Sequence, residues 1–259
     1  MDWLGSRRGI PCGVVVLLWV LFLGGCALQN RLSQDEQRIQ ARLDLAASYL
    51  GNDQPRLSMR ELAALEHRAQ DKARYHYLSG LTARGLDRLP EARRHFQRAV
   101  QIQPGYARAW NNLGQVYVRM GQEQKARQAF EQALSIPTYL TPEYPAYNLG
   151  RLYLDQGQRD KARQKLQESI GHAPDFVPAI LLLSDIQVRG NHLQQAVHTL
   201  RQGLRASPKN PRLMLALAEN LLRRGQPVQA RTWFEDIVRT APDSQPAQVA
   251  TDYLALLPE

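Results

Sequence analysis

Six small side chains recur along this chain at a nearly constant interval, and this spacing constrains the fold more than any other feature. The intervals are 34, 34, 36, 34 and 34 residues, between Ser58, Ala92, Ala126, Ala162, Ala196 and Ala230. A large apolar residue follows each of them four positions later: Leu62, Phe96, Phe130, Leu166, Leu200 and Phe234. A small residue also stands twelve positions before each: Ala46, Gly80, Gly114, Gly150, Ser184 and Ala218. Self-similarity at such a period predicts a stack of repeated units that share one continuous core.

The pattern inside each unit is helical. Apolar residues follow the α-helical period in every segment, and no alternating stretch requires a β-sheet. Glycines at Gly121 and Gly157 mark tight turns within units. Four units end at a proline, which lacks an N–H and restricts the residue before it: Pro104, Pro174, Pro208 and Pro242. Each unit is therefore expected to be two antiparallel helices, whose small residues let the backbones approach while Phe or Leu fills the space to the next unit.

The third unit contains a characteristic set of residues: Trp110, Asn111, Asn112, Leu113, Gly114, Tyr117, Ala126, Phe130 and Ala133. This set resembles the consensus of the tetratricopeptide repeat. The resemblance extends over residues 39–244 and implies an all-α fold, a right-handed superhelical solenoid of about six helix-turn-helix repeats. The expected repeats are 39–72, 73–106, 107–140, 143–176, 177–210 and 211–244. In the remainder, 245–259, Val249, Tyr253, Leu254 and Leu257 have helical spacing and predict a C-terminal capping helix.

The amino-terminus has the features of a bacterial lipoprotein signal peptide. Arg7 and Arg8 precede an apolar run, and the 14 residues of 10–23 are fewer than the about 20 that a membrane-spanning helix requires. The run ends in Leu23-Gly24-Gly25-Cys26, which matches the lipobox, where a thiol after the cleavage site receives a diacylglyceryl group. We predict a signal peptide at 1–25, lipidation at Cys26 and a lipidated tether at 26–38. The alternative is a short membrane anchor with an incidental cysteine.

Lipidation has consequences for redox chemistry and location. Cys12 would leave with the signal peptide, so the mature chain would have no thiol for a disulfide. Three acyl chains would bind a membrane far more firmly than one myristoyl group, whose binding constant is about 10⁴ per molar. Ala27, in place of Asp, resembles the sorting signal of outer-membrane lipoproteins in enteric bacteria. The expected location is the bacterial outer membrane, with the protein lipid-anchored and facing the periplasm.

Composition and motifs favour binding over catalysis. The net charge is +9, but no run of Lys or Arg exceeds two residues and no basic stretch is interleaved with aromatics, so no nucleic-acid partner is expected. None of the six histidines has a metal-ligand spacing, and solvated or half-buried structural roles are expected for His67, His76, His95, His172, His192 and His198. Nucleophile motifs and phosphate-binding loops are absent from the sequence. We expect no enzyme activity, catalytic residue, metal, cofactor or small-molecule substrate.

The tetratricopeptide resemblance also implies a concave surface lined by the first helix of each repeat. The side chains predicted to form a protein-binding groove there are Arg74, Tyr77, Leu81, Arg84, Arg108, Asn111, Asn112, Gln115, Tyr144, Tyr147, Asn148 and Arg151. Tyr and Arg are enriched at protein interfaces, and Asn amides both donate and accept, as an extended peptide backbone requires. The alternative is that these side chains only solvate an unoccupied face.

One irregularity interrupts the period. Thr141 and Pro142 are inserted between the third and fourth repeats, in a run that also contains Pro137 and Pro145. One interpretation is a loop-length variation, which repeat proteins tolerate. The other is a reshaped junction that opens the groove or presents a loop to a partner.

A lipobox followed by six repeats with this junction resembles the type IV pilus biogenesis lipoproteins of the PilF, PilW and Tgl type. The run 140–150 carries the strongest local similarity. The resemblance implies a pilotin, an outer-membrane lipoprotein that binds secretin subunits and promotes their localisation and multimer assembly for pilus biogenesis and motility. Two alternatives remain: a lipoprotein of outer-membrane β-barrel assembly, and a scaffold for polysaccharide export or cell-wall synthesis.

Overall fold

The computed structural model describes residues 34–257, and all regular secondary structure in this range is helical. Residues 34–51 form the first described helix. The others are α2 (Pro55–Ala63), α3 (Ala73–Gly85), α4 (Leu89–Ile102), α5 (Ala107–Arg119), α6 (Glu123–Leu134), α7 (Glu143–Asp155), α8 (Arg159–His172), α9 (Val177–Arg189), α10 (Leu193–Ala206), α11 (Pro211–Arg223), α12 (Pro227–Thr240) and α13 (Gln245–Leu256). The prediction of an all-α fold is confirmed for this range. The predicted signal peptide and Cys26 lie outside it.

The chain divides into two compact units. The first extends to His95 and is described from residue 34, and the second begins at Phe96 and is described to residue 257. Helix α4 crosses the boundary. Between residues 34 and 257, no helix combines the length and apolarity needed to cross a bilayer.

The first unit packs helix 34–51, α2 and α3 around a small apolar core. Leu43, Leu65 and Leu78 are among its buried members. At the position of the repeated small residue, Ser58 forms a buried hydrogen bond of 2.8 Å between its hydroxyl and that of Thr82. This bond satisfies two buried hydroxyls, and it explains why serine is accepted where the other repeats have alanine.

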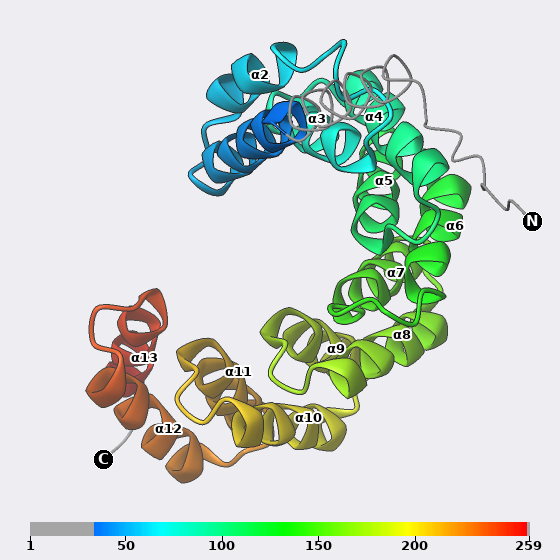
Figure 1. Cartoon of the computed structure of the whole chain (residues 1–259). Coiled ribbons are helices and arrows are strands. Elements are labelled where there is room, and N and C mark those ends of the chain that lie inside the picture. Colours follow the sequence, from blue (N-terminus) through cyan, green and yellow to red (C-terminus); the bar gives the residue numbers. More distant parts are fainter. Residues whose placement is uncertain (1–33, 258–259) are drawn as a thin grey trace, which may run out of the picture. The chain divides into compact units, whose positions relative to one another are not determined.

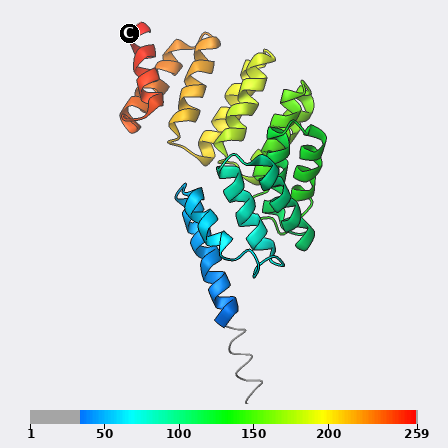
Figure 2. The same ribbon diagram turned by 90° about the horizontal axis from the view of Figure 1, so that it is seen from above.

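The second unit is a stack of helical hairpins, α5–α6, α7–α8, α9–α10 and α11–α12, followed by α13. Figure 1 shows α5, α7, α9, α11 and α13 on the inner side of this unit, with α6, α8, α10 and α12 outside them. Seen after a quarter turn, its successive hairpins stand next to one another (Figure 2). Inner helices also contact one another directly, because α5 packs on α7, α9 on α11 and α11 on α13. We refer to α5, α7, α9, α11 and α13 as the inner helices.

The 34-residue columns of the sequence are the contacts inside each hairpin. A Cβ atom added to Gly114 would lie 2.5 Å from Cε1 of Phe130, and one added to Gly150 would lie 2.8 Å from Cγ of Leu166. Phe130 and Leu166 are fully buried. The small residue on the first helix is therefore required because the large residue on the second helix occupies the space where a side chain would be.

The turns inside the hairpins need backbone conformations that favour particular residues. Gly121, Gly157 and Gly225 have φ angles of 69°, 72° and 70°, in the left-handed region that glycine adopts without steric cost. Asn191 has a φ of 61° at the matching position of α9–α10, and asparagine tolerates this conformation better than most residues. The turns predicted at Gly121 and Gly157 are confirmed.

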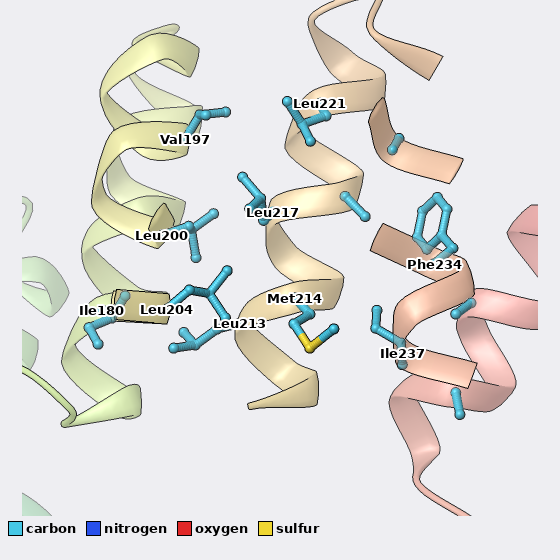
Figure 3. Packing of buried hydrophobic residues seen from close by; sticks show 14 residues of the cluster. Ile180, Val197, Leu200, Leu204, Leu213, Met214, Leu217, Leu221, Phe234 and Ile237 are labelled. Carbon is cyan, nitrogen blue, oxygen red and sulfur yellow. The ribbon is translucent and has the colours of Figure 1, made fainter. Parts of the chain in front are cut away.

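The carboxy-terminal repeats share one continuous apolar core, and Figure 3 shows it extending from α9 to α13. Leu213 and Leu217 of α11 lie between the α9–α10 hairpin and α12. On the last hairpin, the Tyr253 ring stacks on Phe234 with a centroid separation of 4.8 Å and an interplanar angle of 11°. Helix α13 begins at a capping serine, because the Ser244 hydroxyl accepts a hydrogen bond from the Ala247 N–H. It covers the apolar surface that α11 and α12 would otherwise expose.

Candidate protein-binding surface

The predicted groove residues come from three helices. Four lie on α3 in the first unit, namely Arg74, Tyr77, Leu81 and Arg84. The others lie on two neighbouring inner helices of the second unit: Arg108, Asn111, Asn112 and Gln115 on α5, and Tyr144, Tyr147, Asn148 and Arg151 on α7. Because α5 and α7 are in contact, the second unit brings two of the three sets together.

The predicted groove residues of α3 make contacts within the first unit. Arg74 Nη2 lies 2.6 Å from Asp44 Oδ1, in an ion pair with helix 34–51. The carboxyl pKa of Asp44 is lowered, first because it accepts the hydrogen bond from Arg74. Tyr77 and Leu81 are half-buried against the first unit's core. Arg84 is half-buried as well.

An amide pair connects α5 and α7. Asn148 Nδ2 donates to Asn111 Oδ1 over 3.0 Å, and Asn111 is buried with 6% of its surface exposed. Asn112 is also buried, and its Nδ2 donates to the Arg108 carbonyl over 2.7 Å. Asn112 therefore lies inside the helix packing rather than on the exposed face, whereas half-buried Asn148 reaches the surface.

Beside this pair is a pocket of about 320 Å³. Three of the predicted residues line it, Gln115, Asn148 and Arg151. The other lining residues are Val118, Arg119, Phe130, Leu152 and Asp155. The lining thus combines two guanidinium groups, a carboxylate and two amides with apolar side chains, so the pocket offers both hydrogen-bond donors and acceptors.

An aromatic cluster extends the surface toward the inserted residues. The Tyr144 ring meets Phe176 edge-on at a centroid distance of 5.1 Å, and the Tyr147 ring does so at 5.6 Å. The guanidinium of Arg151 lies 5.9 Å from the Tyr147 ring centroid. Tyr144 is 45% exposed, and Leu140, just before the inserted pair, is 86% exposed. The junction thus presents large apolar side chains next to the predicted groove residues. The sequence analysis did not include Phe176, because it considered only residues on the first helix of each repeat and Phe176 immediately precedes α9.

The histidines include one pair that sequence spacing did not indicate. His76 Nδ1 lies 3.1 Å from His95 Nδ1, and His76 Nε2 lies 3.0 Å from the Gln70 carbonyl oxygen. Burial, and then the neighbouring His76, lower the pKa of the His95 imidazole. His76 is buried and His95 is half-buried, and both pack inside the first unit. In residues 34–257, no group of three or more His, Cys, Asp or Glu side chains is arranged to hold a metal ion.

Comparison with known proteins identifies the repeats. Three segments, residues 71–138, 146–175 and 191–251, match models described as tetratricopeptide repeat. The chain is a tetratricopeptide-repeat protein. Among curated proteins, it is 38% identical over 65 residues to the chloroplastic tetratricopeptide repeat domain-containing protein PYG7 of Arabidopsis thaliana. That match covers 25% of this chain and only 22% of PYG7.

Solved structures extend the similarity over most of the tetratricopeptide array. The type IV pilus biogenesis factor PilW matches with a TM-score of 0.66 and 21% identity, over 82% of this chain and 98% of PilW. PilF of Pseudomonas aeruginosa matches with a TM-score of 0.67 and 17% identity, over 84% of this chain and 98% of PilF. YrrB, described as having an unusual peptide-binding site, matches with a TM-score of 0.51 and 18% identity, over 73% of this chain and 96% of YrrB. These similarities confirm the tetratricopeptide solenoid.

Proposed function

We propose that this protein acts in type IV pilus biogenesis as a pilotin, which binds secretin subunits and promotes their localisation and multimer assembly at the outer membrane. The observation that carries the proposal is the match to PilW and PilF, whose lengths are each covered to 98%. A shared repeat does not specify function by itself. The lipobox ending at Cys26 adds support that the repeats do not supply, because it predicts the lipid anchor that a pilotin requires.

The binding surface we propose is the inner face of the second unit. Tyr144, Tyr147 and Arg151 are residue types that contribute strongly to protein interfaces. The partly exposed rings of Tyr144 and Tyr147 lie on the same helix as Asn148, whose amide reaches the same face. Acyl chains on Cys26 would hold a bound subunit at the membrane. The function is binding, with no catalytic step.

Deletion of the gene tests the proposal. In the bacterium that encodes this chain, we expect the heat-stable secretin multimer to disappear from unheated gels of outer-membrane fractions, with secretin monomer taking its place. Expression of the full chain from a plasmid should restore the multimer. Undiminished multimers at the outer membrane in the deletion strain would reject the pilotin role. Such a result would favour β-barrel assembly, polysaccharide export or cell-wall synthesis, and mutant phenotypes in those processes would then identify the function.

A further inference from the structure

A pocket of about 1200 Å³ lies between the outer helices α8 and α10 of the second unit. Side chains of α8, α9, α10 and the turn at 191–192 line it, and we call it the outer pocket. Figure 1 shows α8 and α10 on the outer side of this unit, with α9 inside them. Helix α9 contributes only Leu183 and Gln187, and both are buried. The outer pocket is therefore separate from the inner face that we propose to bind secretin.

The outer pocket lies where one repeat lacks a tyrosine that its neighbours have. The eleventh position of the inner helices is Tyr117 on α5 and Tyr153 on α7, but Gln187 on α9. The Tyr117 hydroxyl accepts a hydrogen bond of 3.0 Å from Gln97 Nε2 of α4, so its ring extends from an inner helix to the preceding outer helix. Gln187 is shorter, and its Oε1 accepts a hydrogen bond of 3.0 Å from the Thr199 hydroxyl of α10. Among residues 34–257, no Phe, Tyr or Trp lines the outer pocket, so the space between α8 and α10 stays open.

The ionisable side chains of the outer pocket are all basic. Arg163, Arg205, His192 and His198 line it, and no Asp or Glu of the described chain does. Arg205 is exposed on the last turn of α10, and nothing in residues 34–257 forms an ion pair or a hydrogen bond with it. Arg163 Nη1 lies 3.3 Å from Asp160 Oδ1 of the same helix, in a solvated ion pair of a kind that contributes little. A pocket lined in this way attracts negative charge.

Hydrogen-bond donors without a partner add to this attraction. Residues 193–195, the first turn of α10, line the pocket, and the N-cap His192 makes no side-chain capping bond to them. The N–H groups of a first helical turn have no partner within the helix and favour an anion. Gln187 is only 6% exposed, its Oε1 is bonded to Thr199, and nothing in the described residues accepts a hydrogen bond from its Nε2. This buried amide donor is available to an occupant of the pocket.

We infer that the outer pocket binds an extended acidic peptide segment of a partner protein. This is a second binding site, and the inference does not depend on the pilotin role. Exposed amides of α8 and α10 line the pocket, and they belong to Gln167, Gln194, Gln195 and Gln202. An amide both donates to a C=O group and accepts from an N–H group, and an extended peptide leaves these groups free whereas a helix bonds them internally. The amides therefore favour an extended backbone, and the guanidinium groups favour carboxylates on it.

The dimensions of the outer pocket also fit a peptide segment. Helix α10 lines it from residue 193 to residue 205, which corresponds to about 18 Å along the helix. An extended chain advances about 3.3 Å per residue, so roughly five or six residues span this length. Small-molecule sites are mostly apolar and measure about 300–1000 Å³, whereas the outer pocket is larger and mainly polar. Sites for single-stranded nucleic acid use aromatic rings on which bases stack, and the described lining has none from Phe, Tyr or Trp.

Peptide binding to the purified full chain in detergent tests the inference. The probe is a fluorescein-labelled ten-residue peptide of alternating glutamate and threonine, and fluorescence anisotropy measures its affinity. One control peptide has glutamine in place of glutamate, and a second has N-methyl groups on alternate backbone amides, which removes backbone donors. Oligogalacturonate, an acidic sugar used as a competitor, supplies negative charge without a peptide. We expect the probe to bind at least tenfold more tightly than each of the three, and equal binding of any of them would overturn the inference.

Substitutions locate the binding in the outer pocket. Gln187→Tyr gives α9 the ring that α5 and α7 have at this position, and it should weaken probe binding at least fivefold by filling the pocket. Arg205→Glu should weaken binding at least fivefold by reversing a charge, and its folding is not at risk because Arg205 is exposed and has no partner in the described chain. Arg201→Glu is the matched control, since Arg201 is exposed one turn away on α10 and does not line the pocket. Circular dichroism checks the folding of each variant, and unchanged affinity in either folded pocket variant would reject the site.

Discussion

Asn148 of α7 donates a hydrogen bond to the buried side-chain oxygen of Asn111 on α5, over 3.0 Å. These residues belong to successive repeats, so the bond fixes the register between two inner helices as well as satisfying a buried acceptor. It also leaves part of Asn148 on the surface that we propose to bind protein. The same pair therefore contributes to stability and borders the proposed binding surface.

Removing the donor should destabilise the second unit. In Asn148→Ala, the Asn111 oxygen loses its partner while it stays buried, which costs about 1–3 kcal/mol of the free energy of unfolding. Urea denaturation followed by circular dichroism measures the change. The double variant Asn111→Ala/Asn148→Ala should lose less than the sum of the two single variants, because both partners are then gone. Strictly additive losses would show that the pair contributes no coupling.

Two glycine-to-alanine substitutions should shift stability in opposite directions. Alanine at Gly114 would overlap the Phe130 ring, and we expect a loss of about 1–3 kcal/mol in the free energy of unfolding. Gly171, near the end of α8, has open space around the added atom. There alanine should raise the free energy of unfolding by about 0.5–1 kcal/mol, because it restricts the unfolded chain. Thermal denaturation of both variants compares them, and a stable Gly114→Ala protein would contradict the packing described above.

The histidine pair predicts acid sensitivity of the first unit. Burial and His76 lower the pKa of His95 in the folded state below its unfolded value of about 6.5. Glu91 and Glu66 act in the opposite direction, and Arg94 in the same direction as His76. Since the unfolded imidazole binds more protons below pH about 6.5, stability is lost as the pH falls from there toward the folded pKa.

Urea denaturation between pH 7.5 and 5 measures this dependence. We expect His95→Gln to reduce the loss of stability over that range. His172→Gln is the control, because His172 is exposed at the end of α8. An equal pH dependence in the wild-type and His95→Gln proteins would show that the pKa of His95 is the same in the folded and unfolded states.

Lipidation should depend on a single atom, the Cys26 sulfur. We predict that Cys26→Ala abolishes incorporation of labelled palmitate and moves the protein out of the outer-membrane fraction. Density-gradient fractionation with immunoblotting follows its location. A Cys26→Ala protein that still incorporates palmitate and sediments with membranes would contradict the predicted lipobox. Cys12→Ala is the matched control and should change neither result.

Charge on the inner face should matter more than charge on the outer face. Arg151 is exposed beside the aromatic cluster on α7, and Arg201 is exposed on outer helix α10. We expect Arg151→Glu to lower the amount of secretin multimer at least threefold, while Arg201→Glu leaves it at the wild-type level. Quantitative immunoblots of unheated membrane samples make the comparison. Equal effects of the two substitutions would place the contact elsewhere than on the inner face.

The sequence alone determined the helical pairs, because their packing recurs every 34 residues. Gly114 and Phe130 sit in fixed columns, and any chain with these columns packs the two helices of a hairpin in the same way. The turn at Gly121 could also be predicted from the local sequence, because its backbone conformation favours glycine. What could be predicted was therefore set by contacts that are close in sequence and repeated.

The tertiary structure alone decided which polar side chains meet. His76 and His95 are 19 residues apart on different helices, and no spacing rule indicates their 3.1 Å contact. Asn112 and Asn148 occupy equivalent positions on their helices. The Asn112 amide donates to a backbone carbonyl of its own helix, whereas the Asn148 amide donates to Asn111 on the neighbouring helix. The physical reason is that burial and hydrogen bonding depend on the neighbouring helix, which differs from repeat to repeat, whereas hairpin packing does not.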